Sequence, residues 1–67
     1  MPKQLDLQEL LEFKQEAYRH DYKLMCQILE LISIEAPMPQ ILALGERCLS
    51  DNVASRSIRL ILDKQYG

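Results

Sequence analysis

Residues 6–36 contain neither glycine nor proline, and this unbroken run is the feature that most restricts how the chain can fold. At its start, Asp6 can accept hydrogen bonds from the N–H groups of a first helical turn, with Glu9 three residues later as in a capping box. At its end, Pro37 disfavours helical geometry at Ala36 and removes a backbone donor. The run therefore predicts one helix of about thirty residues, roughly 45 Å long.

Two shorter helices are expected after this break. Pro39 suits the first turn of a helix, and Gly45 falls inside an apolar face, where it lets a neighbouring helix approach closely. Either Ser50 or Asp51 can cap the helix that follows. We therefore predict an all-α fold in a single domain, residues 1–67. The expected elements are a long amphipathic helix at about 6–36 and a helical hairpin at about 39–49 and about 52–65.

The long helix carries more apolar surface than such a hairpin can cover. At 3.6 residues per turn, its apolar side chains occupy about half of its circumference. Two helices of about ten and fourteen residues leave part of this stripe uncovered, mainly toward the N-terminal half. A domain of 67 residues also buries only about 60% of the surface that its unfolded chain exposes. We therefore expect a homodimeric helical bundle.

Two charged residues, Lys14 and Asp21, interrupt the stripe. If two long helices pack antiparallel about a two-fold axis near Ala17 and Tyr18, Lys14 of each chain faces Asp21 of the other. Alternatively, Lys14 extends to solvent and Asp21 is solvated at the edge of a narrower stripe. The predicted dimer interface consists of Leu7, Leu10, Phe13, Lys14, Ala17, Tyr18, Asp21, Tyr22 and Met25.

The last helix offers a second candidate surface. Helical periodicity places Ala54 and Ile58 on the side of this helix that faces the core, whereas Val53 and Leu60 lie on the opposite side. Single exposed apolar residues are ordinary, but this pair is bordered by cations and suits an acidic, apolar segment of another protein. The predicted partner-binding residues are Val53, Arg56, Arg59, Leu60 and Lys64.

Residues suited to catalysis or metal binding are sparse. His20 is the only histidine, and with Glu16 it provides too few ligands for a metal site. The sequence has no Cys-x-x-Cys, phosphate-binding glycine loop or paired nucleophile and base. We therefore expect no enzyme activity, no metal and no cofactor. We interpret Cys26 and Cys48 as packing residues, with a redox-linked crosslink as the alternative.

Charge and hydropathy restrict the compartment and the partners. Residues 1–39 carry four basic and seven acidic side chains, a net charge of −3. Residues 40–67 carry four basic and three acidic side chains, a net charge of +1, so the whole chain has a net charge of −2. Such a chain is a poor general ligand for polyanions. No apolar segment follows Lys3, so we expect no signal peptide, and no apolar run approaches the roughly 18 residues of a membrane span. We expect a soluble, cytoplasmic protein.

Two functions fit these features best, and a structural subunit of a larger assembly is a third alternative. The first is a non-enzymatic interaction module, a homodimeric adaptor or regulator that binds and modulates another protein. The second is a DNA-binding transcriptional regulator, because the last two helices loosely resemble a helix-turn-helix. Gly45 does not fall in register with the turn glycine of that motif, and we favour protein interaction. The residues that would meet DNA are Arg47, Asn52, Ser55, Arg56, Arg59 and Lys64.

Overall fold

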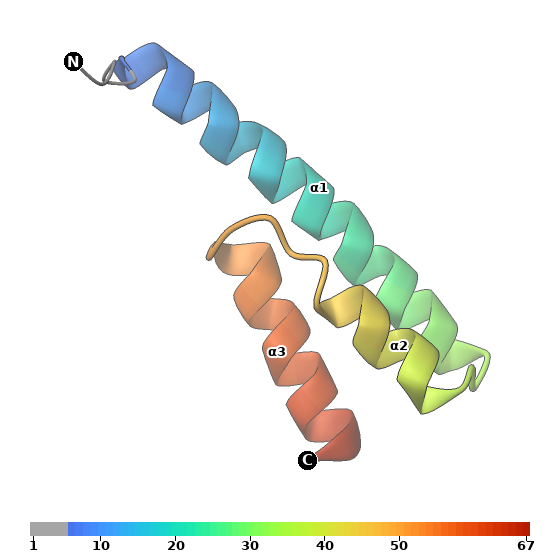
Figure 1. Ribbon diagram of the computed structural model, residues 1–67. Coiled ribbons are helices and arrows are strands. Elements are labelled where there is room, and N and C mark those ends of the chain that lie inside the picture. The colour runs from blue at the N-terminus through green and yellow to red at the C-terminus, as the bar shows by residue number, and fades with distance from the viewer. Residues whose placement is uncertain (1–5) are drawn as a thin grey trace.

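The computed structural model describes residues 6–67, which form three helices and no strand. They are α1 (Leu7–Ser33), α2 (Met38–Gly45) and α3 (Val53–Tyr66). Figure 1 shows α2 and α3 along the C-terminal half of α1, whereas the N-terminal half of α1 projects beyond them. The molecule is accordingly elongated, 49 × 18 × 16 Å. The predicted all-α fold, a long helix followed by two shorter ones, is confirmed.

Side-chain caps begin α1 and α3. In α1, Asp6 accepts a hydrogen bond of 2.8 Å from the N–H of Glu9, as the sequence predicts. In α3, the cap is Asn52, and not either of the two residues before it that we expected. The Asn52 side chain accepts from the Ser55 N–H at 2.9 Å, and the Ser55 hydroxyl accepts from the Asn52 N–H at 2.8 Å. This capping box uses serine where glutamate or glutamine usually signals one.

The end of α1 comes at Ser33, three residues before the predicted end. Glu35 adopts a left-handed conformation with φ 57°. Its N–H donates to the carbonyl of Ile32 at 3.0 Å, and the N–H of Ala36 donates to the carbonyl of Leu31 at 2.9 Å. These two bonds form a Schellman motif, in which glycine is the usual left-handed residue. The sequence gives no sign of it because a glutamate stands there.

The core joins the C-terminal half of α1 to both shorter helices. Its buried residues are Leu24 and Ile28 from α1, Ile41 from α2 and Ile58 from α3. Half-buried apolar side chains surround them, and all of those from α1 lie at Met25 or beyond. The hydrophobic core therefore stops where the hairpin stops, and the first turns of α1 contribute nothing to it.

Gly45 allows α2 and α3 to approach closely, as predicted. A Cβ atom at this position would lie 2.6 Å from Cδ1 of Leu62 on α3. Gly45 is also the last residue of α2, which ends four residues before the predicted end at residue 49. The N–H groups of Leu49 and Ser50, which a longer α2 would use, donate instead to a side chain of α1.

The left-handed Glu35 generates a prediction about stability. We expect Glu35→Gly to increase the free energy of unfolding by about 0.5–1 kcal/mol, because glycine adopts this conformation without the clash of a Cβ atom. Urea denaturation followed by circular dichroism measures the change.

Glu30→Gly is the matched control, since it makes the same substitution at an exposed position inside α1. It should lower the free energy of unfolding by about 1 kcal/mol. Equal losses in the two variants would contradict the left-handed conformation of Glu35.

Candidate interaction surfaces

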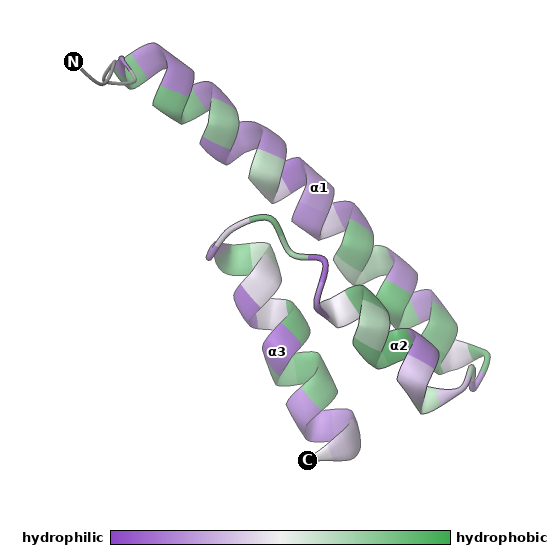
Figure 2. Ribbon diagram, in the orientation of Figure 1, coloured by the Kyte–Doolittle hydropathy of each residue, from purple (hydrophilic) through white to green (hydrophobic). Residues whose placement is uncertain are grey.

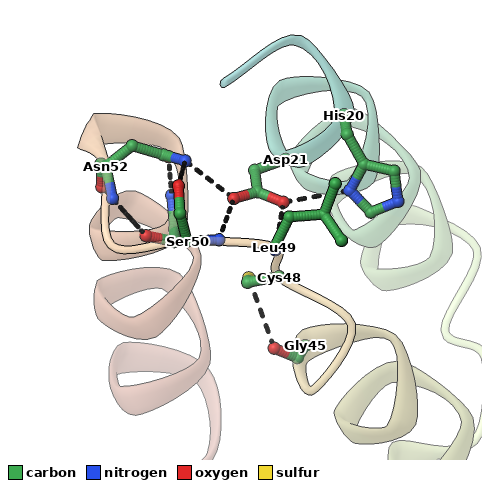
Figure 3. Close-up of polar contacts among 8 residues, drawn as sticks. His20, Asp21, Gly45, Cys48, Leu49, Ser50 and Asn52 are labelled. Atoms are coloured by element: carbon green, nitrogen blue, oxygen red, sulfur yellow. Dashed lines mark hydrogen bonds and ion pairs between the residues drawn. The ribbon is translucent and has the colours of Figure 1, made fainter. Parts of the chain in front are cut away.

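The side chain of Asp21, a residue of α1, is completely buried against the segment that joins α2 to α3. One carboxylate oxygen accepts from the Leu49 N–H at 2.8 Å and from His20 Nδ1 at 3.0 Å. The other accepts from the Asn52 side-chain amide at 2.7 Å and from the Ser50 N–H at 3.4 Å. Figure 3 shows these donors converging on the carboxylate. We call this arrangement the Asp21 cluster; it consists of Asp21, His20, Leu49, Ser50 and Asn52.

The donors of the Asp21 cluster stabilise the ionised carboxylate. Burial raises the pKa of Asp21, but the hydrogen bonds from His20, Leu49, Asn52 and Ser50 outweigh burial and hold the pKa below its ordinary value of 3.8. An ionised carboxylate only accepts hydrogen bonds, so Nδ1 of His20 carries the hydrogen in this contact. The cluster is thus a satisfied buried charge that fixes the loop to α1.

This arrangement corrects part of the predicted dimer interface. Asp21 is enclosed by its own chain, and it therefore does not face Lys14 of a second copy. Ala17, expected at the crossing point of two chains, is also buried in the monomer, and Met25 is half-buried against the core. The spacing of Ala17, Asp21, Leu24 and Ile28 marks one buried face. The sequence therefore placed a carboxylate on the buried face, and this position could have indicated that Asp21 accepts hydrogen bonds from its own chain.

The other predicted interface residues remain exposed on α1. Their exposed fractions range from 38% for Leu10 to 72% for Leu7 among the apolar ones. Figure 2 shows hydrophobic residues continuing along the half of α1 that projects beyond the hairpin. Tyr18 and Tyr22 form an exposed aromatic pair, with ring centroids 6.1 Å apart. The exposed members of the predicted interface are Leu7, Leu10, Phe13, Lys14, Tyr18 and Tyr22.

A second surface lies on the outer side of α3. Val53 and Leu60 are 63% and 71% exposed, as their spacing predicts. A hollow beside Leu60 is lined by Arg56, Arg59 and Asp63. Arg56 Nε lies 3.6 Å from a carboxylate oxygen of Asp51 and donates to the Asn52 carbonyl at 3.3 Å. We call this surface the α3 strip; it consists of Val53, Arg56, Arg59, Leu60 and Lys64.

Two residues of the DNA-binding alternative are directed inward. Ser55 is fully buried in the capping box, and the amide of Asn52 is bound to Asp21. Neither side chain is placed to contact a base edge, which is what sequence-specific recognition requires. The remaining four residues, Arg47, Arg56, Arg59 and Lys64, are exposed cations suited to phosphate contacts.

The two cysteines differ in their surroundings. Cys48 is half-buried against the core, as a packing residue should be, whereas Cys26 is exposed, so its predicted packing role is wrong. Neither forms a disulfide. Burial and the nearby charge of Asp21 raise the pKa of the Cys48 thiol, which donates to the Gly45 carbonyl at 3.5 Å. A raised pKa disfavours the nucleophilic thiolate. Within residues 6–67, no three His, Cys, Asp or Glu side chains gather as a metal site would require.

None of the helices between residues 6 and 67 combines the length and apolar character needed to cross a membrane. The chain matches no known family model, no curated protein and no solved structure.

The Asp21 cluster predicts a large effect of Asp21→Asn. In this variant one carboxylate oxygen is replaced by an NH₂ group, which cannot accept a hydrogen bond. The two donors that met that oxygen in the wild type therefore lose their acceptor. We expect the free energy of unfolding to fall by about 2–4 kcal/mol at neutral pH. Asp51→Asn is the control, because Asp51 is exposed and its contact with Arg56 should contribute less than about 1 kcal/mol.

The effect of Asp21→Asn should also depend on pH. Because folding lowers the pKa of Asp21, its stabilising contribution is complete above the ordinary value of 3.8 and is lost as the pH falls through the lowered pKa. The difference in unfolding free energy between wild type and variant should therefore shrink on acidification. Urea titrations at a series of pH values measure it, and a difference that grew toward low pH would contradict this role.

Proposed function

We propose that this chain is a non-enzymatic interaction module that forms a homodimer through α1 and binds and modulates another protein through α3. The observation that carries the proposal is the row of exposed apolar side chains on the half of α1 beyond the hairpin. Contiguous apolar surface of this kind is typical of interfaces, since water is a poor solvent for it. We propose the cytoplasm as the compartment, in keeping with the two free thiols.

The size of the domain supports self-association. Only six apolar residues are buried among those the structure describes, all at or after Ala17. Within the part of the chain that the structure describes, Leu7, Leu11 and Phe13 remain exposed and lie outside the core. A second copy offers exposed apolar side chains of α1, Leu11 among them, a contact without requiring another protein.

The α3 strip supports a distinct binding partner. Leu60 offers an apolar anchor, and Arg56, Arg59 and Lys64 surround it with positive charge. A short acidic segment with one or two apolar side chains has the complementary chemistry, and the opposite charges accelerate its association. The strip lies on the side of α3 away from the core, so both surfaces can be occupied together.

Self-association is tested by sedimentation equilibrium. Wild type should show about twice the 7.8 kDa chain mass at micromolar concentration, and Leu11→Glu should dissociate at least roughly tenfold more readily because it places a charge in an apolar contact. Leu60→Glu is the control, since it adds the same charge to an exposed leucine of α3. A wild-type chain that stays monomeric at millimolar concentration would contradict the homodimer.

Partner binding is tested by capture from a lysate of the native host, followed by identification of the bound proteins. Wild type and Gln65→Glu should retain the same proteins, whereas Leu60→Glu should lose them through repulsion of acidic segments. Gln65 is exposed on α3 outside the strip. An equal loss in both variants would contradict the assignment to the strip. Micromolar binding to random duplex DNA, weakening steeply with salt, would instead support the regulator.

A further inference from the structure

A second apolar row runs along α1 beside the face that meets α2 and α3. It consists of Leu11, Tyr18, Tyr22 and Leu29, and we call it the open stripe. The spacings of seven, four and seven residues keep these side chains on one side of the helix. Their exposed fractions are similar, between 42% and 47%, from the projecting half of α1 to the part covered by the hairpin.

We propose that the part of the open stripe from Leu11 to Tyr22 is covered by the same part of a second copy, antiparallel and in one register. In this register Leu11 of each chain packs on Tyr22 of the other, and Gln15 packs beside Tyr18. This inference rests on the proposed homodimer and adds its geometry. The open stripe lies beside the face that buries Asp21 and Ala17 within each chain.

The shape of the open stripe suits another helix. Together with Gln15, the stripe residues Leu11, Tyr18 and Tyr22 follow one another at intervals of four, three and four residues, which is the repeat of a coiled-coil seam. Shallow hollows lie along it, one between Leu11 and Arg19 and another between Tyr18 and Lys23. Side chains of a facing helix fill hollows of this kind.

Charges at the edge of the stripe select the antiparallel direction. Glu12 and Arg19 lie on the same edge, and Lys14 lies on the opposite edge. A parallel pair would bring Lys14 of one chain beside Arg19 of the other, and like charges repel. The antiparallel pair brings Glu12 of each chain beside Arg19 of the other, twice per dimer.

The same charges select the register. A shift of seven residues in one direction would bring the two Arg19 side chains together, and the opposite shift would bring the two Glu12 side chains together. Both shifts exchange two attractive contacts for a repulsive one. A second copy in the proposed register is therefore the occupant whose charges match this edge.

The test is a charge-reversal cycle followed by sedimentation equilibrium at low salt. Glu12→Arg and Arg19→Glu should each raise the dimer dissociation constant roughly tenfold, because each variant creates two like-charge contacts. The double variant should return toward the wild-type constant, since it restores both pairs with exchanged positions. Glu16→Arg is the control: this residue is exposed on the same helix but away from the stripe, and its reversal should leave the constant unchanged.

The outcomes separate the register from the homodimer itself. A wild-type dimer that both single variants leave unchanged would overturn the register and keep the proposed self-association. Single variants that dissociate without recovery in the double variant would also overturn this register. A wild-type chain that is monomeric at millimolar concentration would overturn both. Far-ultraviolet circular dichroism of each variant establishes that a weakened dimer is not an unfolded chain.

Discussion

The fold depends on one buried carboxylate. A charge removed from water is costly unless hydrogen bonds replace its hydration, and Asp21 meets that requirement with donors from α1 and from the segment before α3. Among residues 6–67, its contacts are the only hydrogen bonds that join α1 to the segment between α2 and α3. Asn52 both binds Asp21 and caps α3, so the same interaction sets where α2 ends, where the loop lies and where α3 begins.

The Asp21 cluster also divides α1 into two parts with different surroundings. On the C-terminal side, Leu24 and Ile28 contact both shorter helices. On the N-terminal side, the helix continues beyond the hairpin with its large apolar residues exposed (Figures 1 and 2). A hairpin of this length cannot cover a helix of 27 residues, and the surplus supports association with a second chain. The candidate surface on α1 is thus a consequence of unequal helix lengths.

Local chemistry made much of this architecture predictable. The cap at Asp6, the absence of helix breakers and the exposed pair Val53 and Leu60 each depend on neighbouring residues and were recognised from the sequence. The role of Asp21 was not, because three of its four donors come from residues 28 to 31 positions later. Glu35 was missed for a different reason: the left-handed position carries no glycine. Tertiary contacts, and not helix periodicity, decided which polar residues of α1 face inward.

The projecting half of α1 implies a gradient of order along a single helix. Its turns before Ala17 are held by backbone hydrogen bonds and the Asp6 cap, without core contacts. Isolated helices shorter than about 12–15 residues are marginal in water. We therefore expect this half to exchange its amide hydrogens by local opening more readily than the half beside Ile28. Any partner that covers the projecting half also reduces its conformational entropy. Part of the interaction energy is then spent on ordering the helix, which favours a reversible complex that forms and dissociates with changes in protein concentration.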